Sequence, residues 1–357
     1  MSEQRYDIVI AGGGMIGTSL ALALAPLGLR IAVVEAVARQ DDAQPSFDDR
    51  STALSRSTQR MFEAMGLWGD IVAASTPIRS IHVSDQGRFG FSHIDADEQG
   101  VEALGYVVIN RVLGGVLQGA LRDTPEVSVV CPARIVAVAL DEEIATASVE
   151  LEDGSLRELS CSLLVAADGA NSAVREMIGI NAQQSRYGQR AVIGNLLPEK
   201  PVNNVAYERF TAHGPLAVLP VAEGRASFVW TVSEDEAERV MSLDDEAFLA
   251  ELQGEFGYRL GRFSRVGKRA AYPLVLSKAL RLTSTRSVLI GNSAHGLHPV
   301  SGQGFNLGMR DVAAIVDCIA DARLDSGSCD PGDAALRSRY SAWRHSALRK
   351  MVSFSGR

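Results

Sequence analysis

The hydrophobic pattern of the chain contains three short apolar runs, and each is followed by a loop rich in small residues. The runs are Tyr6–Ala11, Leu163–Ala166 and Ser287–Ile290. Runs of this length, bounded by glycine and other turn residues, predict buried strands. The loops after them read GGGMIG, DGANS and GNSAHGLHPVSGQG. The combination of strand and loop therefore occurs near the start, in the middle and near the end of the chain.

A helix is predicted after each loop. The first runs from Met15 to about Ala25, a short one starts at Ser172, and a third contains Val312, Val316 and Ile319 at helical spacing. Because Pro26 removes a backbone hydrogen bond, we expect the first helix to end or kink there, with Gly28 closing it. A second apolar strand, Leu29–Val34, follows.

The pattern changes after Ile180. Residues 205–233 alternate in the manner of strands, with turns at His213–Pro215 and Glu223–Gly224. Residues 244–256 look helical, and residues 269–279 look like a strand that returns to the first part of the chain. We expect an α/β fold in which a sheet-rich lobe is inserted into the domain that carries the glycine-rich loops.

The composition and charge of the chain argue against several classes of protein. With 357 residues, 46% of them hydrophobic, the chain can build a large core. A net charge of −8 makes nucleic acid an unlikely partner. No apolar run reaches the ~20 residues of a membrane span, and no secretory signal is visible. The four cysteines form no CxxC pair, and no His/Cys/Asp cluster has metal-ligand spacing, so we expect reduced thiols and no metal site.

The first loop has the chemistry of a dinucleotide site. Gly12 permits a tight turn, Gly14 lets backbone N–H groups approach a pyrophosphate, and Gly17 lets the helix pack close to the strand. Glu35 ends the second strand, where it can accept hydrogen bonds from a ribose. The alternative is a merely structural turn, but the strand, helix and acid around the glycines favour the dinucleotide.

The middle loop carries the pattern DGxxSxxR, formed by Asp168, Ser172 and Arg175. Asp-Gly alone is a common turn, and the serine and arginine make the pattern more specific. Arg50 and Arg111 could each reach a phosphate, although an isolated arginine is usually a solvated surface charge.

These three motifs, in this order, resemble those of FAD-dependent aromatic hydroxylases of the para-hydroxybenzoate hydroxylase type. Shorter stretches, HVSDQGRFG, ERFTAHGPLAVLPV and HPVSGQGFNLGMRD, resemble the ubiquinone-biosynthesis branch, nearest to hydroxylases of 2-octaprenyl-6-methoxyphenol. The resemblance implies a Rossmann-like FAD-binding domain (residues 1–75, 100–182 and 273–357) and an inserted substrate domain (residues 76–99 and 183–272). Members of this group usually continue some tens of residues further, so the chain looks short at its C-terminus.

The resemblance also implies cofactor contacts. The residue matching Asn292 contacts the ribityl chain of FAD, the loop through Pro299 lies beside the isoalloxazine ring, and the backbone of residues 304–306 meets its pyrimidine edge. Arg50 and Arg111 are expected along the phosphates or adenosine, and Asp168 near FAD and the nicotinamide donor. The expected cofactor-binding residues are Gly12, Gly14, Met15, Ile16, Gly17, Glu35, Arg50, Arg111, Asp168, Asn292, Pro299, Gly302, Gln303, Gly304, Phe305 and Asn306.

The implied reaction is hydroxylation of a polyprenylated phenol with NADPH or NADH and O₂, through a flavin hydroperoxide. No general base is assigned: His213, His295 and His298 are expected to be structural or to pack on the flavin. Hydroxylation of another ring position or of a soluble phenol stays open. So do an FAD reductase without oxygen chemistry and a non-catalytic flavoprotein subunit. A halogenase lacks support because the WxWxIP stretch is missing.

Two interpretations fit the C-terminus. Leu336, Tyr340, Trp343, Ala347, Met351 and Phe354 recur at helical spacing, surrounded by Arg337, Arg339, Arg344, Arg349 and Lys350. A basic amphipathic helix can lie on an anionic membrane, whereas packing on the FAD-binding domain is the alternative. We expect a cytoplasmic protein, with peripheral contact to a membrane or to a ubiquinone-biosynthesis assembly left open.

Overall fold

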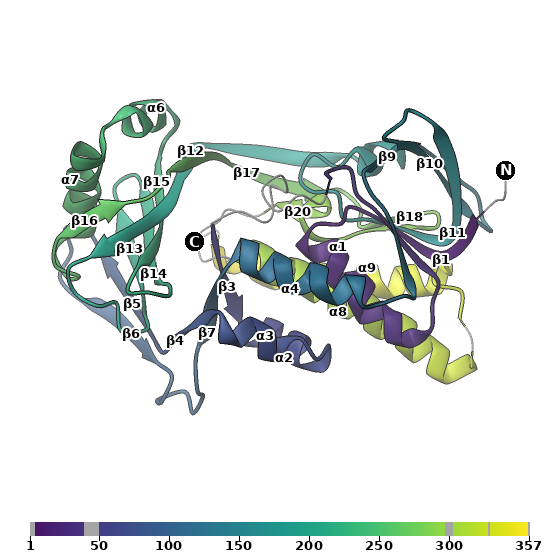
Figure 1. The fold of residues 1–357 in the computed structure, drawn as a ribbon, viewed down its shortest axis with the longest axis horizontal. Helices are drawn as coiled ribbons and strands as arrows, with labels where there is room; N and C mark the ends of the chain where they lie inside the picture. Colours follow the sequence, from purple (N-terminus) through teal and green to yellow (C-terminus); the bar gives the residue numbers. More distant parts are fainter. Residues whose placement is uncertain (1–3, 39–49, 297–302, 328, 356–357) are drawn as a thin grey trace.

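The computed structural model describes residues 4–38, 50–296, 303–327 and 329–355, which form two lobes built on two large sheets (Figure 1). Predicted elements are found: the three apolar runs are strands, and each of the three loops leads to a helix. The helices are α1 (Met15–Leu24), α2 (Arg56–Ala64), α3 (Trp68–Ala73), α4 (Asn110–Arg122), α5 (Ala173–Met177), α6 (Glu234–Ser242), α7 (Asp245–Phe256), α8 (Gln303–Ser326) and α9 (Ala334–Ser355).

The first sheet is largely parallel and holds all three apolar runs. Its order is β18 (Thr283–Ser284), β19 (Ser287–Leu289), β11 (Leu156–Ala166), β1 (Gln4–Ala11), β2 (Ile31–Val34) and β8 (Val127–Val130). A hairpin of β9 (Ala133–Leu140) and β10 (Ala145–Leu151) extends from β11. Because the runs on β1, β11 and β19 are neighbours and parallel, the three loops leave the sheet at the same edge.

Apolar residues of α1, α8 and α9 pack against this sheet, including Leu20, Ile315 and Tyr340. The first helix ends as expected: α1 stops at Leu24, a 3₁₀ turn covers Ala25–Leu27, and Gly28 closes it in the left-handed conformation with a φ of 67°.

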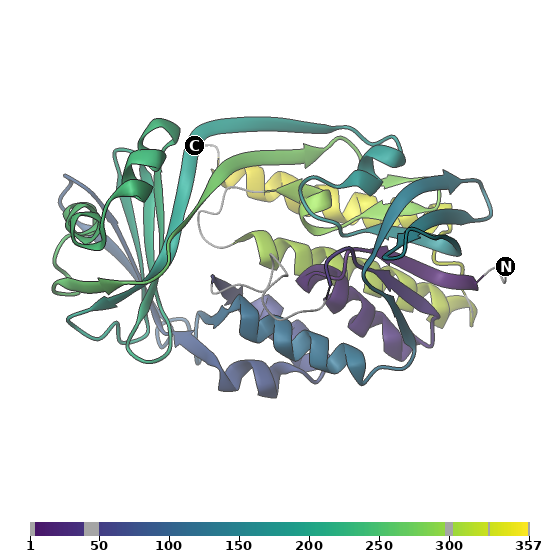
Figure 2. The same ribbon diagram turned by 45° about the horizontal axis from the view of Figure 1, so that its top comes forward.

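The second sheet makes the other lobe. Its order is β20 (His295–Gly296), β17 (Ala270–Ala279), β12 (Ala182–Pro198), β15 (Ala226–Ser233), β14 (Gly214–Pro220), β13 (Val205–Thr211), β5 (Ser80–Asp85) and β6 (Phe91–Asp95), with β16 (Phe263–Val266) beside β12. Helices α6 and α7 cover its outer face, and the long strands β12 and β17 run back to the first lobe (Figures 1 and 2).

A small third sheet lies between the two lobes. It consists of β3 (Ser51–Ser55), β7 (Gly105–Ile109) and β4 (Ser75–Ile78). Val107 and Ile78 of this sheet pack with Ala206 of β13 and Val221. On the other side, Leu54 and Val108 pack with Phe62 of α2 and Leu113 of α4. The small sheet therefore joins the inner face of the second sheet to the helices of the first lobe.

Candidate cofactor site

The first glycine loop is a close-packed turn between β1 and α1. Gly12 has a φ of 102°, and a side chain there would place its Cβ 2.6 Å from the carbonyl oxygen of Ala167. A Cβ at Gly17 would lie 1.9 Å from the carbonyl oxygen of Gly12. Both positions therefore exclude any side chain. Gly14 precedes α1 with an extended backbone and no side-chain cap, so the N–H groups of the first turn can meet an anion.

The Glu35 carboxylate is bound to the first loop. Its Oε2 accepts a 2.6 Å hydrogen bond from the Gly13 N–H, and its Oε1 accepts a 2.7 Å bond from the Val37 N–H. An ionised carboxylate offers about four acceptor positions, so two remain for a ribose. Two further residues contact this loop, and no sequence motif pointed to them. Thr18 Oγ1 and Gln118 Nε2 both donate to the Gly13 carbonyl.

The middle motif forms hydrogen bonds to both the first and the third motif. The Ala167 N–H donates to the Ala11 carbonyl, 2.8 Å away, and Arg175 Nη1 donates to the Ser293 carbonyl at 3.1 Å. Asp168 Oδ2 accepts from the Val174 N–H, but its Oδ1 is buried and has no hydrogen-bond partner among the described residues. A buried carboxylate oxygen in this position fits a ligand that supplies a donor.

The third motif begins with a 3₁₀ turn, Gly291–Ser293, after β19. Ser293 Oγ donates to the Ala166 carbonyl, which fixes the turn beside β11. Asn292 is exposed within it. Ile16 of α1 packs here: a Cβ at Gly308 would lie 2.7 Å from Ile16 Cδ1, and one at Gly291 would lie 3.3 Å from Ile16 Cγ2. The first and third motifs therefore meet through Ile16.

The first turn of α8 contains Gly304, Phe305 and Asn306. Asn306 is 2% exposed, and its side chain is used structurally: Oδ1 accepts from Ser55 N at 2.8 Å, and Nδ2 donates to the Ala53 carbonyl at 2.8 Å. Pro299, Gly302 and His298 lie outside the described residues, as does the side chain of Gln303.

The two arginines that are predicted to bind phosphate have different surroundings. Arg50 directly precedes β3, and its guanidinium carbon lies 4.7 Å from the centre of the Tyr272 ring. Arg111 is exposed in the first turn of α4, which begins beside Arg50 because the Asn110 N–H donates to the Arg50 carbonyl.

A buried pair of charged residues on α8 and α9 holds the start of the third motif. Asp311 of α8 is fully buried, and its Oδ2 accepts a 2.8 Å hydrogen bond from the Gly291 N–H. Arg344 of α9, 2% exposed, pairs with Asp311 Oδ1. His295 Nε2 lies 2.9 Å from Asp311 Oδ2, but the two groups are not aligned for a hydrogen bond.

This buried pair corrects the expected C-terminal stripe. Arg344, expected among the basic residues that surround the stripe, is buried. Trp343, expected on the apolar stripe, is 45% exposed. Leu336 and Tyr340 are buried in the first lobe, as packing requires. Of the other histidines, His295 is buried, whereas His213 is exposed, 3.5 Å from Glu236.

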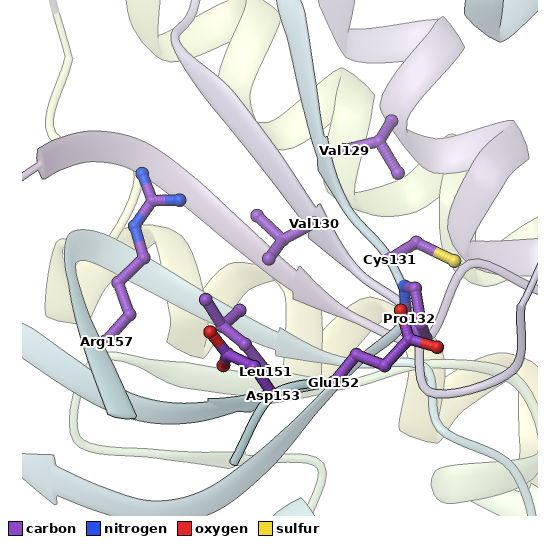
Figure 3. Close-up of a pocket in the computed structure, with 8 residues that line it drawn as sticks. All are labelled: Val129, Val130, Cys131, Pro132, Leu151, Glu152, Asp153 and Arg157. Carbon is purple, nitrogen blue, oxygen red and sulfur yellow. The ribbon is translucent and has the colours of Figure 1, made fainter. Parts of the chain in front are cut away.

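A surface pocket occurs at the edge strand β8, lined by Val129, Val130, Cys131, Pro132, Leu151, Glu152, Asp153 and Arg157 (Figure 3). It lies beside the strand that ends in Glu35, because Glu35 N donates to the Val130 carbonyl. None of the predicted cofactor-binding residues lines it. The glycine loops, with their helix N-terminus and the buried Asp168 oxygen, are chemically better suited to a pyrophosphate and ribose.

The comparisons with known proteins agree with these loops. The family model described as FAD binding domain matches residues 5–355. The ubiquinone hydroxylase UbiL of Rhodospirillum rubrum is 37% identical, over 96% of this chain and 78% of that protein. The 3-demethoxyubiquinol 3-hydroxylase of Escherichia coli is 32% identical, over 90% of this chain and 82% of that protein.

A solved structure has the same fold. The p-nitrophenol 4-monooxygenase PnpA of Pseudomonas putida aligns with a TM-score of 0.80 at 20% identity, covering 96% of this chain and 85% of that one. Within the residues that the structure describes, no helix is long and apolar enough to cross a membrane. The family model matches nearly the whole chain, and the three glycine loops are held together at one edge of the sheet. The chain therefore belongs to the FAD binding domain family and is an FAD-dependent monooxygenase.

Proposed function

We propose that the protein hydroxylates the aromatic ring of a polyprenylated phenol in ubiquinone biosynthesis, with NADPH or NADH as electron donor and O₂ as oxidant. The observation that carries this proposal is the convergence of three glycine loops at one sheet edge, in a chain related to ubiquinone hydroxylases. Substrates of the 2-octaprenyl-6-methoxyphenol type are the first candidates.

Each loop has a proposed role in holding FAD. The N-terminus of α1, with Gly14, Met15 and Ile16, would receive the pyrophosphate, and Glu35 the ribose. Asn292 would receive the ribityl chain, and the first turn of α8 the pyrimidine edge. A helix N-terminus there favours negative charge on the reduced ring system. FAD, when bound, supplies hydride acceptance from NAD(P)H and activation of O₂.

The rest of the chain orients the substrate and excludes water. We propose residues 76–99 and 183–272 as the substrate domain, because their sheet turns its inner face toward the first lobe (Figure 2). That face is apolar near the small third sheet, where Ile78, Val107, Ala206 and Val221 are buried together. An apolar face of this kind suits a prenylated ring and limits the access of water to the reacting atoms.

The test uses purified FAD-bound protein and 2-methoxy-6-prenylphenol, which carries one isoprene unit. We expect NAD(P)H oxidation to accelerate when the phenol is added, and one atom of labelled O₂ to enter the product. NAD(P)H oxidation without label in the product would favour a reductase, and no oxidation at all would favour a non-catalytic subunit. The intermediate that accumulates in cells lacking the protein would then identify the ring position.

A peripheral membrane contact is proposed as the route by which such a substrate arrives. Its test is flotation with anionic vesicles. Binding that survives charge reversal at the exposed Arg339 would exclude an electrostatic contact through this part of α9.

A further inference from the structure

One carboxyl group lies in a row of the second sheet that is otherwise apolar from β5 to β12. Glu208 of β13 lies opposite Ala217 of β14 and opposite Val83 of β5. The row continues from Ala217 to Val229 of β15 and then to Ile193 of β12. Residues directly opposite each other in neighbouring strands share a face of the sheet. Glu208 is therefore the single ionisable member of this row.

The row lies on the inner face. Side chains alternate along a strand, so Glu208 shares its face with Ala206, which is buried against Ile78 and Val107 of the small third sheet. Tyr207 points the other way and contacts Phe256 of the outer helix α7. Figure 2 shows α6 and α7 on the outside and the opposite face of the sheet turned toward the first lobe.

This face is connected to the proposed flavin-ring end of the cofactor site through Ala53. Ala53 of β3 packs against the cluster formed by Ile78, Val107, Ala206 and Val221. Its carbonyl accepts the hydrogen bond from Asn306 Nδ2 in the first turn of α8. A ring bound between the inner face and that turn would have Glu208 on its sheet side.

The Glu208 carboxyl lacks a partner within the described residues. Its Oε1 is buried without a hydrogen bond, and burial alone raises the pKa of the carboxyl to about 7. The neighbours on this face are apolar: Ala217 lies opposite Glu208 on β14, and Ile78 and Val107 pack around Ala206, the next residue of β13 on the same face. The charged residue on this face of β5, Asp85, pairs with Arg88. An unsatisfied buried oxygen is costly, and a ligand that donates a hydrogen bond to it would remove that cost.

We propose that Glu208 is a catalytic residue of the hydroxylation, and that it binds the phenol hydroxyl and takes its proton. The inference rests on the proposed function. The phenol O–H bond breaks and its proton passes to Glu208 Oε1. The electron pair of that bond enters the ring, and a ring carbon forms a C–O bond to one oxygen atom of O₂ as the O–O bond breaks. The second oxygen atom leaves as water, and NAD(P)H, through bound FAD, supplies the two electrons that this reduction needs. The ring then loses the proton from that carbon, and Glu208 returns its own proton to solvent.

The experiment compares the wild-type protein with Glu208→Gln, which keeps the shape and removes the base. We expect bound FAD to be unchanged and hydroxylation of 2-methoxy-6-prenylphenol to fall by about 100- to 10,000-fold. NAD(P)H oxidation continues, with hydrogen peroxide in place of hydroxylated product. The wild-type rate rises with pH as Glu208 loses its proton, and Glu208→Gln lacks that rise. Glu208→Asp recovers part of the rate.

Two controls separate catalysis from structure. Glu255→Gln removes a half-buried carboxyl on α7, on the outer side of the same lobe. Its Oε2 also lacks a hydrogen-bond partner among the described residues, but it lies away from the inner face, so we expect no loss of hydroxylation. Fluorinated analogues have a more acidic hydroxyl and need a base less, so the ratio of wild-type to Glu208→Gln rates should shrink along that series. A ratio that stays constant, or Glu208→Gln rates equal to those of Glu255→Gln, would overturn the proposal. A wild-type protein that hydroxylates none of these phenols would instead refute the proposed function, and the role of Glu208 with it.

Discussion

Replacing Arg344 by Met should destabilise the protein and weaken FAD binding, although Arg344 is not expected to touch FAD. Arg344 pairs with Asp311, and both side chains are at most 3% exposed. Asp311 in turn accepts from the Gly291 N–H. Removing one partner of a buried ion pair leaves an uncompensated charge, which costs about 3–5 kcal/mol. Because Gly291 begins the turn that carries Asn292, we expect FAD affinity to fall together with stability.

The assay is urea unfolding of the FAD-free protein, followed by titration with FAD. The matched control is Arg339→Met, five residues earlier on α9, where an exposed arginine pairs with the exposed Asp321 and little change is expected. The double variant Asp311→Asn with Arg344→Met removes both charges and keeps an acceptor for Gly291. We expect it to recover most of the lost stability.

Two results would refute this reasoning. Arg344→Met could prove as stable as the Arg339→Met control, which would mean that the buried pair contributes nothing. Alternatively, the double variant could be no more stable than Arg344→Met alone, which would mean that lost packing of the arginine stem, and not an unpaired carboxylate, accounts for the effect.

Three further predictions concern other parts of the chain. The pKa of Glu208 is raised to about 7 from an ordinary value of 4.5, so the folded state binds this proton more tightly than the unfolded chain. Wild-type stability should therefore fall relative to Glu208→Gln between about pH 4.5 and 7, by about 3 kcal/mol at most; parallel stabilities across that window, by thermal melts, would contradict it. Gly17→Ala should destabilise the protein by at least about 2 kcal/mol, because its Cβ would meet the Gly12 carbonyl; urea unfolding measures this. Asn292→Leu should weaken FAD binding about 5- to 150-fold, whereas Asn292→Asp should keep FAD and lower the flavin reduction potential by charge repulsion; an unchanged affinity and an unchanged potential, respectively, would disprove each half.

The glycine loops could be predicted from the sequence because their requirements are local. A left-handed or closely packed position admits only glycine, so Gly12 and Gly17 mark the turn directly in the sequence. Pro26 and Gly28 mark the end of α1 in the same way. The roles of individual residues toward FAD stay predictions, since they concern contacts with a ligand. The structure adds that the Asn306 side chain is held by β3 and α2.

Arg344 and Glu208 could not be placed from the sequence, for a shared physical reason. The helical spacing of α9 identifies one buried face, but it does not reveal that an acid 33 residues earlier makes a buried position suitable for an arginine. The alternation of β13 likewise allows Glu208 to face either side. Its burial depends on Ala217, Val83 and the small third sheet, which only strand pairing brings together. Charges inside a protein are determined by tertiary neighbours.

The three loops are held to one another by protein contacts that need no cofactor. The Ala167 N–H binds Ala11, Arg175 binds the Ser293 carbonyl, and Asp311 binds the Gly291 N–H. Where these contacts already fix the backbone, little of the binding energy of FAD is needed to order it. The same contacts make the loops interdependent, because the arginine of the second motif and the aspartate behind the third both fix the turn that carries Asn292. A substitution at Arg175 or Arg344 therefore reaches the cofactor through backbone positions, and its effect on FAD should appear without any change in the residues that touch FAD.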